Sequence, residues 1–195
     1  MNIILASQSP RREELMHYLI DDFAVIPSDF PEREVPFRGD APSYAKELAL
    51  KKAQQVAGIY PEDLIIGSDT VVFKEGELLN KPLDRQDARR MIRLLQGTSH
   101  EVVTSYALIC LDRKIQRVGH VSTQVTFHAM SDQEIEAYLA TGDHAGKAGA
   151  YAIQGAAARF VQGIRGDFYT VVGLPVAALY RELKALGATL KDDLS

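Results

Sequence analysis

Apolar residues occur along the chain in two patterns, and each pattern predicts a different kind of element. Short apolar runs rich in β-branched residues predict strands at residues 3–6, 64–73, 102–111, 115–127, 158–164 and 168–172. Apolar positions at helical spacing predict helices, among them residues 85–95 and a helix that Gly58 ends. The capping residues Asp40, Asp84 and Ser131 predict where three helices begin. Helices alternate with strands, and residues 102–127 form a long hairpin. The pattern therefore predicts an α/β fold with a mixed sheet.

The predicted strand at residues 64–73 is interrupted by polar residues. Gly67, Ser68, Asp69 and Thr70 separate two apolar runs that have the composition of a core strand. A carboxylate between such runs must be paired, bound to a metal or exposed in a cleft, because burial of an isolated charge is costly. The alternative is a turn at the edge of the strand, with Asp69 capping a neighbouring amide. The pattern marks Asp69 as the first candidate for a functional residue.

Composition and charge narrow the class of protein. The 195 residues fit one domain, or two lobes that share one sheet. The formal net charge of -4 argues against nucleic acid as the main partner. No apolar run has the length of a signal peptide or a membrane span, so we expect a cytoplasmic protein without a membrane partner. The single cysteine, Cys110, lies in an apolar run and is expected to be a buried thiol.

The segment after the first strand has the features of an anion site. Ser9 and Pro10 predict the start of a helix, which places Arg11 and Arg12 in its first turn. Cations are mildly unfavourable at a helix start, where free amides already attract negative charge, so two arginines beside Ser7 and Ser9 indicate a site for an anion. An ordinary serine cap with a solvated pair of arginines is the alternative.

Cations, hydroxyls and carboxylates of the chain together predict phosphate chemistry. The cations and hydroxyls at predicted element ends are Ser7, Ser9, Arg11, Arg12, Lys52, Lys81 and Lys147. Cations neutralise phosphate oxygens, whereas the carboxylates of Glu32 and Asp69 suit a divalent metal, although acidic loop residues such as Glu32 are usually only solvated. The residues alone therefore predict a metal-dependent site for a phosphate ester or anhydride.

Six motifs, in order along the chain, carry a resemblance to a known family. They are Leu5-Ala6-Ser7-Gln8-Ser9-Pro10-Arg11-Arg12, Gly67-Ser68-Asp69-Thr70-Val71-Val72, Lys81-Pro82 with Asp84, Lys147-Ala148-Gly149-Ala150-Tyr151, Ile153-Gln154-Gly155 and Val172-Gly173-Leu174-Pro175. Together they resemble the Maf family of nucleoside triphosphate pyrophosphatases over essentially the whole chain. The resemblance implies a single domain over residues 1–195, with two lobes around a central cleft. It also implies an elongated mixed sheet flanked by helices, related to the fold of inosine triphosphate pyrophosphatases (Maf/Ham).

The resemblance also implies an activity and roles for individual residues. The reaction is hydrolysis of a nucleoside triphosphate to a monophosphate and pyrophosphate with Mg²⁺ or Mn²⁺. By this resemblance Asp69 is the proton acceptor, with Lys52 and Lys81 as further catalytic residues, and Glu32 and Asp69 are the metal ligands. The residues expected to bind substrate are Ser7, Ser9, Arg11, Arg12, Thr70, Lys147 and Gln154. The long hairpin is a candidate surface for a homodimer.

Two positions point to the branch of the family that acts on dTTP and UTP. Members of that branch have Thr after the catalytic Asp and Gln in the later motif. This chain resembles them, with Thr70 and Gln154 at these positions. An amide can donate to and accept from a uracil or thymine edge, whereas the Glu of the 7-methyl-GTP branch would repel its carbonyls. Gly146 departs from the family pattern, which commonly has Asp before the lysine. A nucleotide-binding regulator with little turnover, or an enzyme of the 7-methyl-GTP branch, is the alternative.

Overall fold

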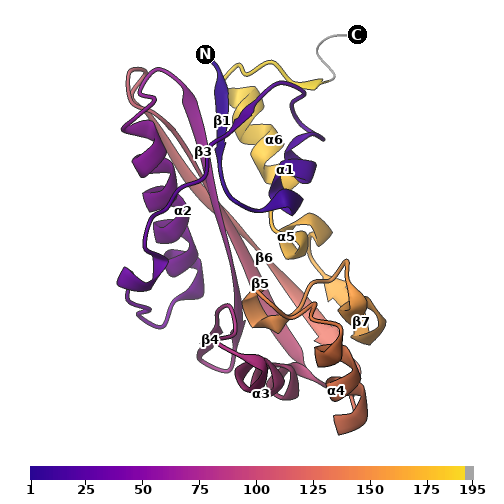
Figure 1. Ribbon diagram of the computed structural model, residues 1–195. Coiled ribbons are helices and arrows are strands. Elements are labelled where there is room, and N and C mark those ends of the chain that lie inside the picture. Colours follow the sequence, from indigo (N-terminus) through magenta and orange to yellow (C-terminus); the bar gives the residue numbers. More distant parts are fainter. Residues whose placement is uncertain (192–195) are drawn as a thin grey trace. The chain divides into compact units, whose positions relative to one another are not determined.

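The computed structural model describes residues 1–191 and confirms the mixed α/β prediction (Figure 1). Its seven-stranded sheet has the order β2-β1-β3-β5-β6-β7, with β4 paired to β3. β1 is parallel to β2 and β3, whereas β4 is antiparallel to β3 and β7 is antiparallel to β6. The strands are β1 (Ile3–Ala6), β2 (Ala24–Val25), β3 (Leu64–Lys74), β4 (Glu77–Leu79), β5 (Ser99–Cys110), β6 (Ile115–Phe127) and β7 (Val161–Arg165). The helices are α1 (Pro10–Met16), α2 (Ala41–Ala57), α3 (Arg85–Leu95), α4 (Asp132–Ala140), α5 (Phe168–Val172) and α6 (Val176–Ala185), with short 3₁₀ turns at Glu32–Glu34, Ala148–Ala150 and Ala156–Phe160.

The chain folds into two compact units. The first unit comprises Met1–Asp69, Thr104–Val121 and the described chain from Gly173 onward. The second unit comprises Thr70–Val103 and Ser122–Val172. β3, β5 and β6 each contribute residues to both units. A single domain with two lobes around a cleft stays a prediction.

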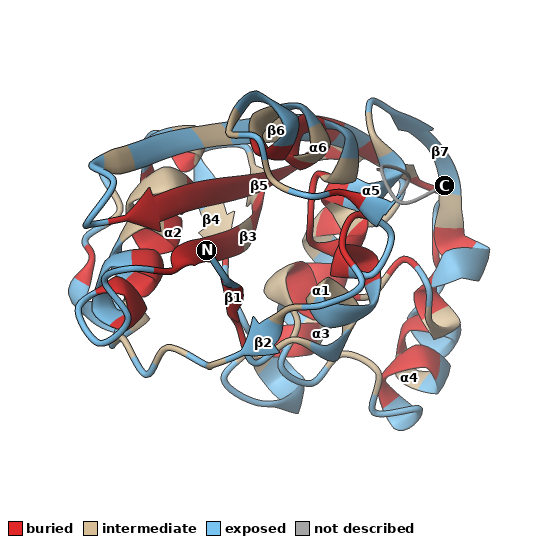
Figure 2. Ribbon diagram, turned by 90° about the horizontal axis from the view of Figure 1, so that it is seen from above, coloured by how far each residue is buried: buried red, intermediate tan, exposed pale blue. Residues whose placement is uncertain are grey.

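The first unit is built on the parallel strands β1 and β3. Figure 2 shows that buried residues concentrate on β1, β3 and β5. Small side chains of α2 pack on these strands in one apolar cluster, made of Ile4, Ala6, Ala49, Ala53, Val56, Ala57, Ile65, Ala107 and Ile109. α1 and α6 lie on the other side of the same strands (Figure 1). Cys110 is buried, as expected of a core thiol.

At Gly67, helix α2 lies close against strand β3. A Cβ atom at this position would lie 2.3 Å from the carbonyl oxygen of Ala49 and 2.9 Å from Cβ of Ala53. Both contacts are shorter than packed atoms tolerate, so a side chain at position 67 would push the helix away from the strand. The glycine is therefore what allows α2 to lie directly on β3.

We expect Gly67→Ala to lower the free energy of unfolding by about 2 kcal/mol, because the added methyl group overpacks the contact between α2 and β3. Urea denaturation of the two proteins measures the difference. Gly58→Ala is the matched control, since Gly58 has φ −63 and a Cβ there would lie 3.5 Å from its nearest neighbour, the Gln55 carbonyl oxygen. Equal losses in the two variants would contradict this account of Gly67.

Local capping signals correctly predicted three helix starts. Asp40 accepts a hydrogen bond from the Ser43 amide at the start of α2, at 2.8 Å. Asp84 does the same for the Asp87 amide at the start of α3. Ser131 and Glu134 form the reciprocal capping box of α4.

Among the described residues, no helix combines the length and apolar character needed to cross a membrane.

Residues 168–172 form helix α5 and not the strand that their composition predicts. The reason lies at Asp167, whose carboxylate accepts hydrogen bonds from the backbone amide and the hydroxyl of Thr170, both at 2.7 Å. The Asp167 amide in turn donates to Thr123 Oγ1 on β6 at 3.0 Å. An aspartate that binds the amide three residues later starts a helical turn, and here it overrides the β propensity of the apolar residues.

A buried histidine lies in the aromatic core of the second unit. The ring of His100 packs edge-on against Phe127 and Tyr151, and its Nε2 lies 2.7 Å from the Tyr151 hydroxyl. Burial, and to a lesser extent the charge of Lys74, lowers the pKa of His100 from its ordinary 6.5 to about 4. Burial likewise raises the pKa of Tyr151, so this pair is uncharged at neutral pH.

This histidine makes stability depend on pH. The unfolded chain binds a proton at His100 below its ordinary pKa of 6.5, whereas the folded protein binds it only near pH 4. Stability is therefore lost as the pH falls from 6.5 towards 4, and we expect His100 to lower the free energy of unfolding by about 2 kcal/mol between pH 7 and pH 5. Urea denaturation at the two pH values measures the change. In His100→Gln, the free energy of unfolding should change correspondingly less between the two pH values. A change as large as that of the unaltered protein would contradict the role given to His100.

Candidate functional site

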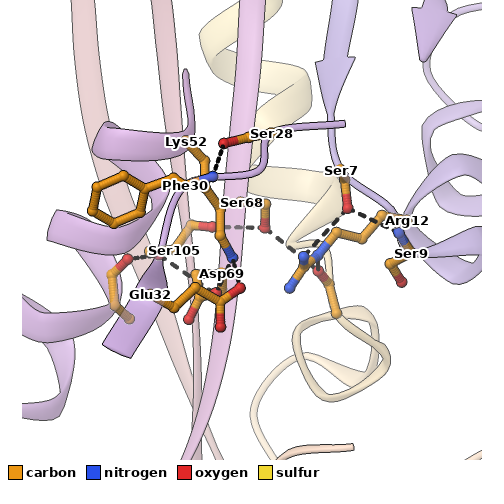
Figure 3. A network of polar contacts seen from close by, with 12 residues as sticks. Ser7, Ser9, Arg12, Ser28, Phe30, Glu32, Lys52, Ser68, Asp69 and Ser105 are labelled. Carbon is orange, nitrogen blue, oxygen red and sulfur yellow. Dashed lines mark hydrogen bonds and ion pairs between the residues drawn. The ribbon is translucent and has the colours of Figure 1, made fainter. Parts of the chain in front are cut away.

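A lysine joins two carboxylates in the first unit (Figure 3). Nζ of Lys52 lies 2.5 Å from Oδ1 of Asp69 and 2.7 Å from Oε1 of Glu32. The Lys52 and Asp69 side chains are 10% and 9% exposed, and that of Glu32 is 37% exposed. Two carboxylates share one ammonium, so the cluster has a formal charge of −1 and its open side is at Glu32. Of the three possibilities for Asp69, the structure shows the paired one.

The secondary structure explains why Lys52 meets Asp69. Lys52 lies on the face of α2 that packs on β3, next to Ala49 and Ala53. Asp69 is two residues after Gly67, and alternate residues of a strand point to the same face. The close contact at Gly67 thus brings the ammonium to the carboxylate. The sequence contained the signal, a glycine inside an apolar strand, but its reason appears only in the structure.

Two fully buried serines lie beside Asp69. Ser68 Oγ donates a hydrogen bond to the Ser105 carbonyl at 2.8 Å, which joins β3 to β5. Ser105 Oγ donates to the Ala45 carbonyl of α2 at 2.5 Å and lies 3.4 Å from the Asp69 carbonyl. These hydroxyls connect the helix and both strands at the level of Asp69. Sequence reasoning identified Ser68 only as part of a motif and did not identify Ser105.

The loop before α2 brings Glu32 to the cluster. Glu32 begins the 3₁₀ turn Glu32–Glu34. Upstream, Ser28 Oγ accepts a hydrogen bond from the Phe30 amide at 3.1 Å and donates to Gln55 of α2 at 2.5 Å. Gln55 also binds Asp29. These contacts tie the loop to α2, so Glu32 reaches Lys52 even though no sequence motif surrounds it.

Arg12 is a partly buried cation of the N-terminal segment. Its Nε donates to the Gly173 carbonyl at 2.8 Å, and its Nη1 lies 3.4 Å from Ser7 Oγ, which also accepts from the Ser9 amide (Figure 3). Burial lowers the pKa of Arg12, and the charges of Asp69 and Glu32 oppose that shift. Ser9 is at the N-cap of α1 as predicted, but its side chain makes no capping bond. Arg11 is the residue before Arg12 in the same helix.

The remaining predicted site residues belong to the second unit. Thr70 continues β3 directly after Asp69. Lys81 follows Asn80, whose carbonyl accepts a hydrogen bond from the Gly149 amide at 3.3 Å, two residues after Lys147. The contact brings the segments of Lys81 and Lys147 together. Gln154 is exposed in the loop before the turn at Ala156–Phe160.

The carboxylates fit a metal that is held partly by substrate. Within residues 1–191, no group of three or more histidine, cysteine or carboxylate side chains is arranged to hold a metal by itself. Glu32 and Asp69 supply two carboxylates that already converge on one cation, the ammonium of Lys52. Mg²⁺ is commonly bound by one or two carboxylates together with water and substrate phosphates. The donor set therefore suits a metal that accompanies a polyphosphate.

Gly146, where the family pattern has Asp, adopts a backbone conformation that favours glycine. Its φ is +68, and a Cβ atom there would have no neighbour within 4 Å. The next residue, Lys147, is the lysine that the family pattern has at this position, and it precedes the turn at Ala148–Ala150. Space therefore does not require the glycine at this position, whereas the backbone conformation is well suited to it.

Comparison with known proteins gives similarity over nearly the whole chain. Residues 2–186 match the family model described as Maf-like protein. The chain is 46% identical over 189 residues to the dTTP/UTP pyrophosphatase of Koribacter versatilis (strain Ellin345), covering 96% of this chain and 95% of that protein. It is 42% identical over 185 residues to the dTTP/UTP pyrophosphatase of Ruminiclostridium cellulolyticum, covering 95% and 96%. Among solved structures, the Ham1 protein of Staphylococcus aureus matches 65% of this chain and 72% of its own, with a TM-score of 0.46 and 12% identity.

Proposed function

The chain belongs to the Maf family, and we propose on that premise that it hydrolyses dTTP and UTP to the nucleoside monophosphate and pyrophosphate. The observation that carries the proposal is the identity of more than 40%, over nearly the full length, with relatives of that name. Thr70 and Gln154 support the same branch of the family, and the cluster of Glu32, Lys52 and Asp69 supplies groups suited to the chemistry.

We assign the chemical step to Asp69. Its carboxylate orients a water molecule and accepts the proton as the water oxygen bonds to the α-phosphorus. The bond from that phosphorus to the bridging oxygen then breaks, and pyrophosphate leaves with the oxygen. Lys52, which contacts Asp69 at 2.5 Å, holds the carboxylate in place and adds positive charge beside the reacting phosphate. Lys81 contributes a second catalytic cation.

Glu32 and Asp69 would hold the divalent metal, Mg²⁺ or Mn²⁺. When bound, the metal neutralises phosphate charge and polarises the phosphoryl oxygens. The negative charge of the cluster of Glu32, Lys52 and Asp69 favours a cation, and the partly exposed Glu32 leaves an open side for it. Chelation of divalent ions is accordingly expected to stop turnover.

Cations and hydroxyls of the N-terminal segment bind the triphosphate in this proposal. Arg12 is held by Gly173 and Ser7, which restricts its guanidinium before substrate arrives. A planar guanidinium with several donors suits phosphate oxygens. Arg11, Ser7 and Ser9 act beside it, and Lys147 binds the same polyphosphate.

In this proposal, Thr70 and Gln154 recognise the base of the nucleotide. Uracil and thymine present two carbonyls and one N–H, and an amide side chain can pair with both kinds of group. The exposed position of Gln154 supports this role.

We also propose that the protein acts as a cytoplasmic homodimer on free nucleotides, not on nucleic acid or membranes. The net charge of -4 and the single buried cysteine are consistent with those conditions.

A panel of nucleotides tests the proposal. With Mg²⁺ present, we expect pyrophosphate release from UTP and dTTP, and little from 7-methyl-GTP. Rapid turnover of 7-methyl-GTP alone would place the protein in the other branch of the family. Tight binding of UTP without release of UMP would instead support the nucleotide-binding regulator, for which Gly146 is the motivation. Gel filtration at several concentrations tests the homodimer.

A further inference from the structure

Gln154 lies in a tight turn whose C-terminal end is fastened by a carboxylate. The Gly155 amide donates to the Ala152 carbonyl at 3.0 Å, which makes Gln154 the third residue of a four-residue turn. Directly after the turn, the Ala156 amide donates to Oδ2 of Asp143 at 2.7 Å. A carboxylate that accepts from a backbone amide makes a stronger bond than a neutral acceptor does.

Gly155 shows how closely Asp143 approaches the turn. A Cβ atom at position 155 would lie 2.3 Å from Oδ2 of Asp143, so a side chain there would displace the carboxylate. Asp143 is itself held, because its amide lies 3.2 Å from Thr141 Oγ1 at the end of α4. The carboxylate thus ties the turn to the end of a helix.

The N-terminal end of the turn is fastened by buried aromatic side chains. The Tyr151 hydroxyl bonds His100 on β5 at 2.7 Å, and the Tyr138 hydroxyl of α4 donates to the Ala150 carbonyl at 2.9 Å. Ala150 has φ 62, a left-handed conformation that is strained for a residue with a side chain. Such strain persists only where the surroundings determine the backbone, and it is concentrated at functional sites.

The side chain of Gln154 differs from these anchors because it is exposed. The residues fastened on either side of it, Tyr151 and Ala156, leave only four residues between them. The fold therefore fixes the backbone that carries the amide while leaving the amide itself open to a ligand.

We propose that Asp143 is a positioning residue for base recognition, which holds the turn of residues 152–155 so that Gln154 meets the uracil or thymine edge. Tyr151 and His100 hold the other end of the same turn. The inference rests on the proposed function, because it takes the base from the substrates assigned there. Asp143 acts through Gln154 and has no contact with the reacting phosphate in this proposal.

The test compares UTP with CTP, which differ at the base edge and share the sugar and triphosphate. We expect Asp143→Ala to lower the ratio of kcat/KM for UTP to kcat/KM for CTP by about tenfold, since the turn loses its charge-assisted bond. Asp143→Asn should keep a larger part of the ratio than Asp143→Ala, because its amide oxygen still accepts from the Ala156 amide but carries no charge. Asp132→Ala is the matched control, an exposed aspartate of α4 that pairs with Arg93.

A double-mutant cycle separates positioning from general damage. If Asp143 acts through Gln154, the variant carrying both Asp143→Ala and Gln154→Ala has the same UTP to CTP ratio as Gln154→Ala alone. Losses that multiply, or equal losses for UTP and CTP, would overturn the role of Asp143 while leaving the pyrophosphatase assignment intact. A wild-type protein that releases no pyrophosphate from UTP would overturn the proposed function itself, and the inference with it.

Discussion

Asp69→Asn is expected to lower kcat for UTP by about a thousandfold while the protein still binds the nucleotide. The substitution keeps nearly the same volume and still offers Lys52 an oxygen at this position. It removes the negative charge and the ability to accept a proton, which are the properties assigned to this residue. Pyrophosphate release measures turnover, and calorimetric titration with UTP measures binding.

Asp63→Asn is the matched control for this prediction. Taken as whole residues, Asp63 and Asp69 are 7% and 6% exposed, and both are in the first unit. Asp63 accepts a hydrogen bond from the Asn2 amide at 3.2 Å and has no place in the proposed chemistry. Its variant should therefore keep its turnover. Normal turnover in Asp69→Asn would refute Asp69 as the proton acceptor.

Lys52→Met is expected to reduce both stability and turnover. Removal of the ammonium leaves two carboxylates facing each other, one of them buried, so we expect the free energy of unfolding at pH 7 to fall by about 2 kcal/mol. This is below the usual cost of breaking a buried pair because Glu32 is partly exposed. We expect kcat to fall about a hundredfold as Asp69 loses its partner.

Lys51→Met separates the role of the ammonium from that of the helix. Lys51 is the preceding residue of α2 and is exposed, so its variant should have normal stability and turnover. Urea denaturation and pyrophosphate release measure the two effects. If the two lysine variants behave alike, the ion pairs of Lys52 contribute nothing beyond the helix itself.

Sequence reasoning identified those features of the fold and the site that depend on local chemistry. The helix starts at Asp40, Asp84 and Ser131 follow from side chains that bind amides three residues away, and such contacts are visible in the sequence. The interrupted strand likewise marked Asp69, because a carboxylate among apolar residues requires a partner. The structure shows that β3 continues through the polar residues without a break.

Contacts between distant segments account for what the sequence did not reveal. The partner of Asp69 depends on the distance between α2 and β3, which Gly67 determines by having no side chain. Helix α5 depends on Asp167, whose position is set by Thr123, 44 residues earlier. Ser105 and Asp143 were overlooked for the same reason, since their partners are backbone groups of other elements. The composition of the chain and the spacing of its residues carry no information about these contacts between distant segments.

The interleaved course of the chain has a consequence for engineering. The peptide bond between Asp69 and Thr70 is a boundary between the two units, and each unit collects separate stretches of sequence. No single crossover in the gene can therefore exchange one unit between two family members. A chimera that exchanges the whole second unit must replace Thr70–Val103 and Ser122–Val172 together, which takes two inserts and four junctions.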